Sequence, residues 1–143
     1  MENTNYKIFL VDDDIFHLNM TEQILRDSGQ TDITLFENGV DCLNALHLEP
    51  EVIFLDHNMD NYTGYEVLRK IKRYNPNIFV VMVSSQEEIK TAVLSLKYGA
   101  FDYLEKDTRL SENLKTTLKK INEMKALLKE RKPSLIKQVL KYI

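Results

Sequence analysis

The chain has 143 residues, a length typical of one domain, and a formal net charge of −3. Its single cysteine, Cys42, excludes an internal disulfide, and no apolar run is long enough for a membrane span. The N-terminus has no signal-peptide pattern, so the sequence predicts a soluble, cytoplasmic protein. Charge is uneven: 20 acidic and 10 basic residues precede position 115, whereas 2 acidic and 9 basic residues follow from Lys115 onward. The basic part could bind an anionic surface, but a solvated helix face is the simpler interpretation.

Short apolar runs alternate with segments of helical spacing along the chain. The runs that predict strands occupy residues 8–11, 33–36, 52–55, 78–83 and 101–104. They are rich in valine, isoleucine and phenylalanine, and three of them are almost continuously apolar. Continuous apolar runs are typical of strands that are covered on both faces, as in a parallel sheet.

The segments that follow these strands predict five helices. Gly29 and Gly99 are placed to end the first and the fourth helix, and the Asn-Pro pair at 75–76 stops the third. Ser111 is placed to cap the fifth helix. Cys42 falls in the second helix, where we expect a small buried hydrophobic side chain rather than a nucleophile. The apolar positions that define the helices are, in chain order, Ile15, Leu18, Met20, Ile24 and Leu25; Val40, Leu43 and Leu46; Val67, Leu68 and Ile71; Ile89, Val93 and Leu96; and Leu114, Leu118, Ile121, Met124 and Leu128.

Five strand-helix units in strict alternation predict an α/β fold with a doubly wound parallel sheet. Pro133 is expected to end the last helix, and the sequence SLIKQVLKYI after it is a short amphipathic segment. We therefore expect one domain over residues 1–128 and a helical extension or linker remnant over residues 129–143.

The stretch IFLVDDDIF, residues 8–16, places three carboxylates directly after the first predicted strand. Like charges about 4 Å apart repel by roughly 1 kcal/mol in water, and by roughly 4 kcal/mol at an effective dielectric constant near 20. The adjacent Asp12, Asp13 and Asp14 therefore indicate a nearby cation, or a separate role for one of them. Asp14 opens the first helix and is best interpreted as its N-cap or first-turn acid.

Other polar side chains follow the third, fourth and fifth predicted strands. They are Asp56, Ser84 and Lys106, and ligands of an open α/β sheet bind at these carboxyl ends. Two carboxylates of the triplet together with Asp56 predict a Mg²⁺ site, because Mg²⁺ prefers carboxylates, waters and phosphate oxygens. A solvated acidic cap on the first helix is the alternative when the triplet is considered alone.

The motifs VDDD, FLDHNMDNYTG, MVSS and YLEKD, in this order and spacing, resemble the receiver domain of two-component response regulators over about residues 6–128. The resemblance implies a flavodoxin-like fold with strand order 2-1-3-4-5. It also implies that a histidine kinase or a phosphotransfer protein donates a phosphoryl group to an aspartate. Phosphorylation would then remodel the face of the fourth helix, fifth strand and fifth helix, where a downstream protein binds.

The resemblance assigns the phosphoacceptor and the metal ligands by position. Asp56 matches the aspartate that receives the phosphoryl group. Asp12 and Asp13 match the acidic pair that binds Mg²⁺, with Asp56 and the backbone carbonyl of Asn58 as further ligands. Phosphoryl transfer depends on positioning and on charge stabilisation, which a metal ion and a lysine can supply.

The remaining roles concern contacts with the phosphoryl group, the conformational change that follows phosphorylation, and the lifetime of the phosphoryl group. Lys106 matches the lysine that pairs with the aspartate and then with the phosphoryl group, and Ser84 matches the hydroxyl that hydrogen-bonds it. Tyr103 matches the aromatic residue that turns inward as Ser84 is drawn to the phosphate. Asn58 and Gln86 match the positions that tune the phosphoryl lifetime, and their amides favour moderate rather than very slow self-dephosphorylation. The protein is expected not to be an enzyme beyond self-catalysed phosphotransfer and this dephosphorylation.

The sequence departs from the family pattern near the site. Asp60 stands where proline is common, and Thr63 where an acidic residue often precedes the glycine. Asp107 follows Lys106 where many members have a cis-proline. Because a cis peptide without proline costs about 2.5–4 kcal/mol, we expect a trans bond there.

Several alternatives remain open from the sequence. The chain has no room for a DNA-binding output domain, so it resembles a stand-alone or truncated receiver without direct nucleic-acid binding, and partly heptad spacing in the fifth helix permits a homodimer. A receiver-like interaction scaffold without phosphorylation is one rival. A phosphohydrolase with Asp12 as nucleophile is another, and a nucleic-acid binder with a basic tail is the third.

Overall fold

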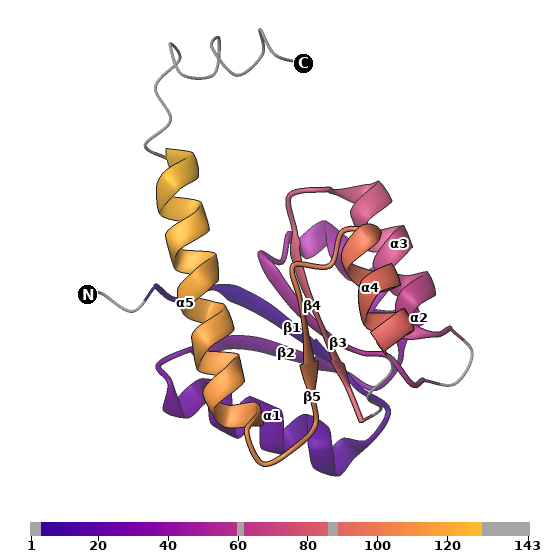
Figure 1. Ribbon diagram of the computed structural model, residues 1–143, viewed down its shortest axis with the longest axis horizontal. Helices are drawn as coiled ribbons and strands as arrows, with labels where there is room; N and C mark the ends of the chain where they lie inside the picture. The colour runs from indigo at the N-terminus through magenta and orange to yellow at the C-terminus, as the bar shows by residue number, and fades with distance from the viewer. Residues whose placement is uncertain (1–3, 60–61, 86–88, 130–143) are drawn as a thin grey trace, which may run out of the picture.

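Five parallel strands form one sheet in the computed structural model, which describes residues 4–59, 62–85 and 89–129 (Figure 1). The strand order is β2-β1-β3-β4-β5, as the resemblance implied, and every neighbouring pair is parallel. Each predicted strand is confirmed to within about two residues at its ends. The strands are β1 (Lys7–Val11), β2 (Asp32–Phe36), β3 (Val52–Asp56), β4 (Phe79–Ser84) and β5 (Asp102–Glu105).

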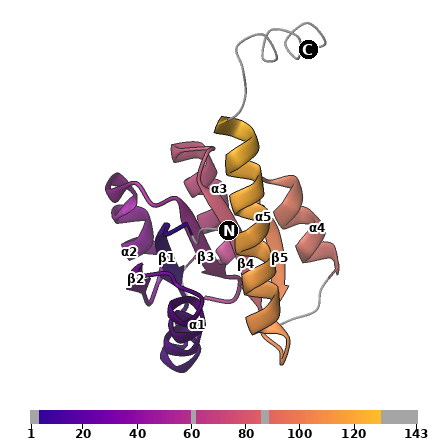
Figure 2. The same ribbon diagram turned by 90° about the vertical axis from the view of Figure 1, so that its left-hand side faces the viewer.

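The helices cover both faces of the sheet (Figures 1 and 2). Along β1, Ile8 and Leu10 point to the core under α1 and α5, whereas Phe9 and Val11 point to the core that contains α2 and α3. This alternation is the period of two that any strand imposes. The doubly wound prediction is therefore confirmed. The helical elements are α1 (Ile15–Asp27), α2 (Gly39–Asn44), the 3₁₀ turn η1 (Leu46–Leu48), α3 (Gly64–Tyr74), α4 (Ile89–Lys97) and α5 (Leu110–Lys129).

Most of the predicted helix ends are confirmed. The Asp14 carboxylate accepts a hydrogen bond from the His17 backbone N–H at 3.3 Å, which makes Asp14 the N-cap of α1. Gly29 follows the end of α1 with φ at 101°, a conformation that glycine adopts without steric cost. The predicted cap at Ser111 is wrong, because Ser111 lies inside α5. Asp107 sits upstream instead, and its carboxylate accepts from the Arg109 N–H at 2.9 Å.

In two helical segments, the apolar positions that predict the helix do not form one buried face of an α-helix. In α4, the apolar residues Ile89, Val93 and Leu96 are 81%, 57% and 48% exposed, and the buried residue is Ser95. The buried and half-buried residues of α4 are Thr91, Ala92, Leu94 and Ser95, so these three large side chains lie on the outward side. In the second helical segment, Leu46 is buried but belongs to η1, because the α-helix ends at Asn44.

The residues that the structure describes include no helix that is long and apolar enough to cross a membrane. Within them α5 extends to Lys129. The predicted break at Pro133 lies outside the described residues, and the predicted domain boundary at residue 128 stays a prediction.

Candidate phosphoacceptor site

A buried lysine joins two aspartates at the carboxyl ends of the central strands. Asp12 follows β1, Asp56 is the last residue of β3, and Lys106 follows β5. Lys106 Nζ lies 2.8 Å from Asp12 Oδ2 and 3.1 Å from Asp56 Oδ1. Because β1 and β3 are neighbours in the sheet, residues that are 44 positions apart meet at one point. The structure thus brings together three of the residues that the sequence singled out.

Asp13 completes an acidic cluster with these two aspartates. One carboxylate oxygen each from Asp12, Asp13 and Asp56 lie within 4.8 Å of one another, with Asp13 exposed and the other two buried. Asp56 Oδ1 is buried, and Lys106 Nζ, at 3.1 Å, is its charged partner among the described residues. A buried carboxylate oxygen with spare acceptor capacity, beside two further carboxylates, fits the all-oxygen coordination that Mg²⁺ prefers.

The environments of the two buried carboxyl groups, Asp12 and Asp56, shift their pKa values in opposite directions. Burial and the charge of Asp12 raise the pKa of Asp56 to about 6, although Lys106 and the backbone N–H of Asn58 oppose this. For Asp12, burial alone would raise the pKa, but hydrogen bonds from His17, Lys106 and the backbone of Asp14 outweigh it, and the pKa is lowered. Burial likewise opposes the charge of Lys106, yet its two carboxylate partners raise its pKa above the ordinary value. Lys106 is therefore a cation shared between two acids.

His17 is a site residue that the sequence reasoning missed. Its Nδ1 lies 3.1 Å from Asp12 Oδ2 and 3.4 Å from the hydroxyl of Thr21, and the ring is about nine-tenths buried. Its Nε2 is buried and makes no hydrogen bond within residues 4–59, 62–85 and 89–129. A histidine on the inward face of the first helix, five positions after Asp12, was the available signal. It restrains the orientation of the Asp12 carboxylate.

The start of α3 is held directly against the end of β3. A Cβ at Gly64 would lie 2.3 Å from the backbone oxygen of Asp56 and 2.7 Å from Cα of His57. The Gly64 N–H donates to the His57 carbonyl at 2.9 Å, which closes the intervening loop. Only glycine permits this approach, and it fixes the backbone that carries Asp56 and the exposed Asn58.

The other predicted site residues have different placements. Ser84 is the last residue of β4, fully buried, and its carbonyl accepts from the Lys106 N–H at 2.8 Å. Tyr103 lies in β5 and packs, partly buried, against the core that contains α2 and α3. The Lys106–Asp107 peptide bond is trans, as predicted. Gln86 and Asp60 lie outside the described residues.

The fold and the site define a class of doubly wound α/β proteins with three aspartates and a lysine at the carboxyl edge of the sheet, which is where ligands of open α/β sheets bind. Comparison with known proteins narrows that class. Residues 8–119 match the family model described as the response regulator receiver domain. This match covers well over half of the chain. The chain belongs to the response regulator receiver family.

Relatives and solved structures agree with this assignment. The transcriptional regulatory protein ZraR of Escherichia coli K12 is 34% identical over 121 residues, which cover 84% of this chain and 27% of that protein. The CheY-like receiver domain from Methanospirillum hungatei JF-1 superposes with a TM-score of 0.77 at 25% identity, over 86% of this chain and 98% of that one. NtrX from Brucella abortus superposes with a TM-score of 0.79 at 27% identity, over 90% of this chain and 30% of that one. The chain thus spans about a quarter of the length of the curated relatives that it matches.

Proposed function

We propose that Asp56 accepts a phosphoryl group from a histidine kinase or a phosphotransfer protein in the presence of Mg²⁺. The observation that carries this proposal is the buried Asp56 carboxylate, with Lys106 Nζ at 3.1 Å and the oxygens of Asp12 and Asp13 within 4.8 Å. Asp12, Asp13, Asp56 and the backbone carbonyl of Asn58 would hold the metal ion. A bound Mg²⁺ would neutralise the charge on the transferring oxygens.

The chemistry follows from the charges around Asp56. Its carboxylate oxygen attacks phosphorus, the P–N bond of the donor phosphohistidine breaks, and the imidazole leaves with the bonding electron pair. Lys106 is already held between two carboxylates and can turn from Asp12 and Asp56 toward the new phosphoryl oxygens. The pKa of Asp56 near 6 leaves the carboxylate mostly ionised above neutral pH, and so able to act as the nucleophile.

We further propose that phosphorylation alters the face formed by α4, β5 and α5. Ser84 would donate a hydrogen bond to the phosphoryl group, and Tyr103 would turn inward in response. Support comes from α4, whose Ile89, Val93 and Leu96 are exposed and offer an apolar surface to a downstream protein. Further support comes from Lys106 of the site, which follows directly on β5 and so joins the site to this face along the chain.

Two further proposals, on the lifetime of the phosphoryl group and on a homodimer, rest on residue positions alone. The amides of Asn58 and Gln86 would orient an attacking water and give moderate self-dephosphorylation. The exposed C-terminal half of α5 offers a surface for a homodimer. Output through a bound protein, rather than through direct contact with nucleic acid, remains our proposal for residues 1–143, as does a location in the cytoplasm.

The test is intact-mass spectrometry after incubation with acetyl phosphate and Mg²⁺, with Asp56→Asn as the control. The expected result is one added phosphoryl group on the parent protein alone, lost when a chelator is present. No added mass in either protein, with Mg²⁺ still bound, would favour a receiver-like scaffold that does not use phosphorylation. Added mass in both would mean that another residue, such as Asp12, is the acceptor.

A further inference from the structure

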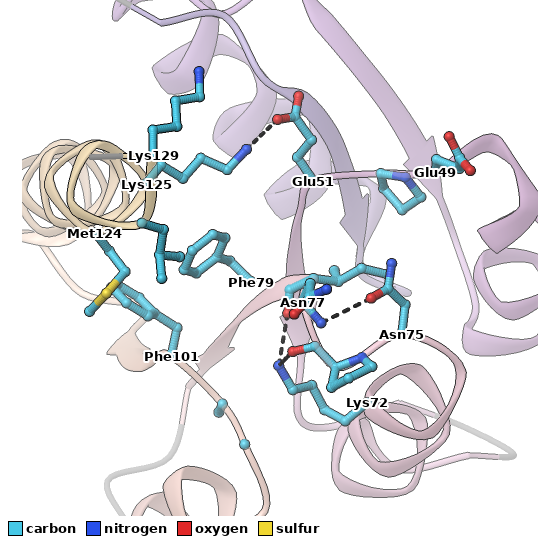
Figure 3. Close-up of a pocket in the computed structure, with 16 residues that line it drawn as sticks. Glu49, Glu51, Lys72, Asn75, Asn77, Phe79, Phe101, Met124, Lys125 and Lys129 are labelled. Carbon is cyan, nitrogen blue, oxygen red and sulfur yellow. Dashed lines mark hydrogen bonds and ion pairs between the residues drawn. The ribbon is translucent and has the colours of Figure 1, made fainter. Parts of the chain in front are cut away.

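A groove of about 950 Å³ is drawn in Figure 3 with the residues that line it. It lies at the opposite end of the sheet from Asp56. Its walls are the segments that precede β3, β4 and β5, together with the last turns of α5. Because the strands are parallel, their amino ends all meet at this edge, whereas the phosphoacceptor site uses their carboxyl ends. The groove is therefore separate from the proposed phosphoacceptor site.

The groove has an apolar lining, and the last turns of α5 contribute part of it. Phe79 and Phe101 pack edge to face there, with ring centroids 5.2 Å apart. The inward stripe of α5 is fully buried as far as Ile121, but its continuation, Met124 and Leu128, is 42% and 50% exposed. The helix thus carries its apolar stripe past the part of the body that covers it, and this leaves an uncovered apolar wall.

Two of the three lysines that line the groove, Lys72 and Lys125, have partners within the domain. Lys125 pairs with Glu51, and its ammonium group also lies over the ring of Tyr6. Lys72 Nζ donates to the carbonyls of Pro76 and Ile78 at 2.7 and 2.9 Å. These contacts stabilise the groove itself, so a small anionic ligand that used Lys72 or Lys125 would have to displace them. An apolar occupant fits the lining better.

We propose that this groove binds residues 134–143 of the same chain, here called the tail. Drawn at 100° per residue, its five aliphatic residues fall within about 140° of a helical wheel, with lysine and glutamine opposite. Such a face needs an apolar surface to cover it. The tail is joined to the groove wall by only four residues, 130–133. The aliphatic residues are Leu135, Ile136, Val139, Leu140 and Ile143.

The short connection favours docking within one chain. Two antiparallel helices are commonly joined by two to five residues, so α5, the connection at 130–133 and the tail match a helical hairpin. Pro133, at the end of the connection, prevents α5 from simply continuing. Lys137 and Lys141 lie opposite the aliphatic face on the helical wheel, so they would face solvent. A ten-residue helix has little stability alone, so the groove would supply its stability.

The experiment compares three proteins of residues 1–143 by hydrogen exchange, without phosphoryl donor or divalent cation. They are the parent, an apolar-face variant (Leu135→Ser with Leu140→Ser) and a matched polar-face variant (Lys137→Ser with Gln138→Ser). Tail amides should exchange at least about tenfold more slowly in the parent and the polar-face variant than in the apolar-face variant. All substitutions lie in the tail, so the folded body stays the same.

The methyl resonance of Met124 gives a second readout from the groove. It should shift between the parent and the apolar-face variant, and stay unchanged in the polar-face variant. Met20 on α1 is comparably exposed, does not line the groove, and serves as the internal control. Protection of the tail should be the same at every protein concentration, whichever oligomeric state sedimentation shows.

Two results would overturn the proposal. Equal and fast exchange of the tail in all three proteins, with an unchanged Met124 resonance, would show that the tail does not occupy the groove. Protection that grows with concentration alongside dimer formation would show that the groove binds the tail of a second copy instead. Neither result depends on whether Asp56 is phosphorylated.

Discussion

Replacing Asp56 with asparagine is expected to stabilise the metal-free protein. The residue is 3% exposed, and burial together with the charge of Asp12 raises its pKa from 3.8 to about 6. The folded state therefore holds the proton more tightly than the unfolded state. Stability falls as pH rises from 3.8 through 6, and the whole cost is present above pH 6. A pKa difference of about 2 corresponds to about 3 kcal/mol, which the uncharged asparagine does not incur.

The assay is urea unfolding in the presence of a chelator, at about pH 7.5 and about pH 5. At the higher pH, the free energy of unfolding of Asp56→Asn should exceed that of the parent by about 3 kcal/mol, and at the lower pH by about half as much. Asp12→Asn is the matched control with the opposite sign. The pKa of Asp12 is lowered in the folded state, so that variant should lose about 1–3 kcal/mol.

The pH dependence separates this explanation from a general packing effect. If Asp56→Asn is no more stable than the parent near pH 7.5, or if the difference does not change with pH, the electrostatic reasoning is wrong. Added Mg²⁺ should narrow the gap between parent and variant, because a ligand that binds the folded parent stabilises it. A gap that Mg²⁺ leaves unchanged would argue against Asp56 as a metal ligand.

Three further predictions test the packing of the domain. In urea unfolding, Gly64→Ala should lower the free energy of unfolding by about 2 kcal/mol or more, because the new Cβ would lie 2.3 Å from a backbone oxygen. An unchanged unfolding midpoint would contradict this close approach. His17→Leu should cost about 1–3 kcal/mol in the same assay, since it removes the partner 3.1 Å from Asp12, and His17→Gln, which keeps a donor, should recover part of it. Val93→Ser on α4 should change the free energy of unfolding by less than about 0.5 kcal/mol. Leu114→Ala in the buried stripe of α5 should lower it by about 2–5 kcal/mol. Comparable losses in the two variants would mean that the face of α4 with Val93 is buried.

Local patterns in the sequence were sufficient for the strands and for most helix ends. The apolar runs, the Asp14 cap and the glycine after α1 depend on interactions within a few residues, so they can be derived without the fold. The residue types at the carboxyl ends of the strands were equally visible. Because β1 and β3 are neighbours and parallel strands end at one edge, Asp12 and Asp56 lie close together, and Lys106 reaches both of them from the end of β5, two strands beyond β3.

Only the tertiary structure decided which side chains are buried, which way each helix face points, and which charged groups interact. An apolar periodicity marks a helix but cannot tell which element covers it, so the stripe of α4 was visible while its outward direction was not. His17 gained its role only when α1 packed its inner face beside Asp12. The raised pKa of Asp56 likewise needs both burial and a second carboxylate from another strand. The amino acids determine which elements form and which chemistry is available, whereas the assembled layers determine what is covered, charged and exposed, because desolvation depends on neighbours that are distant in sequence.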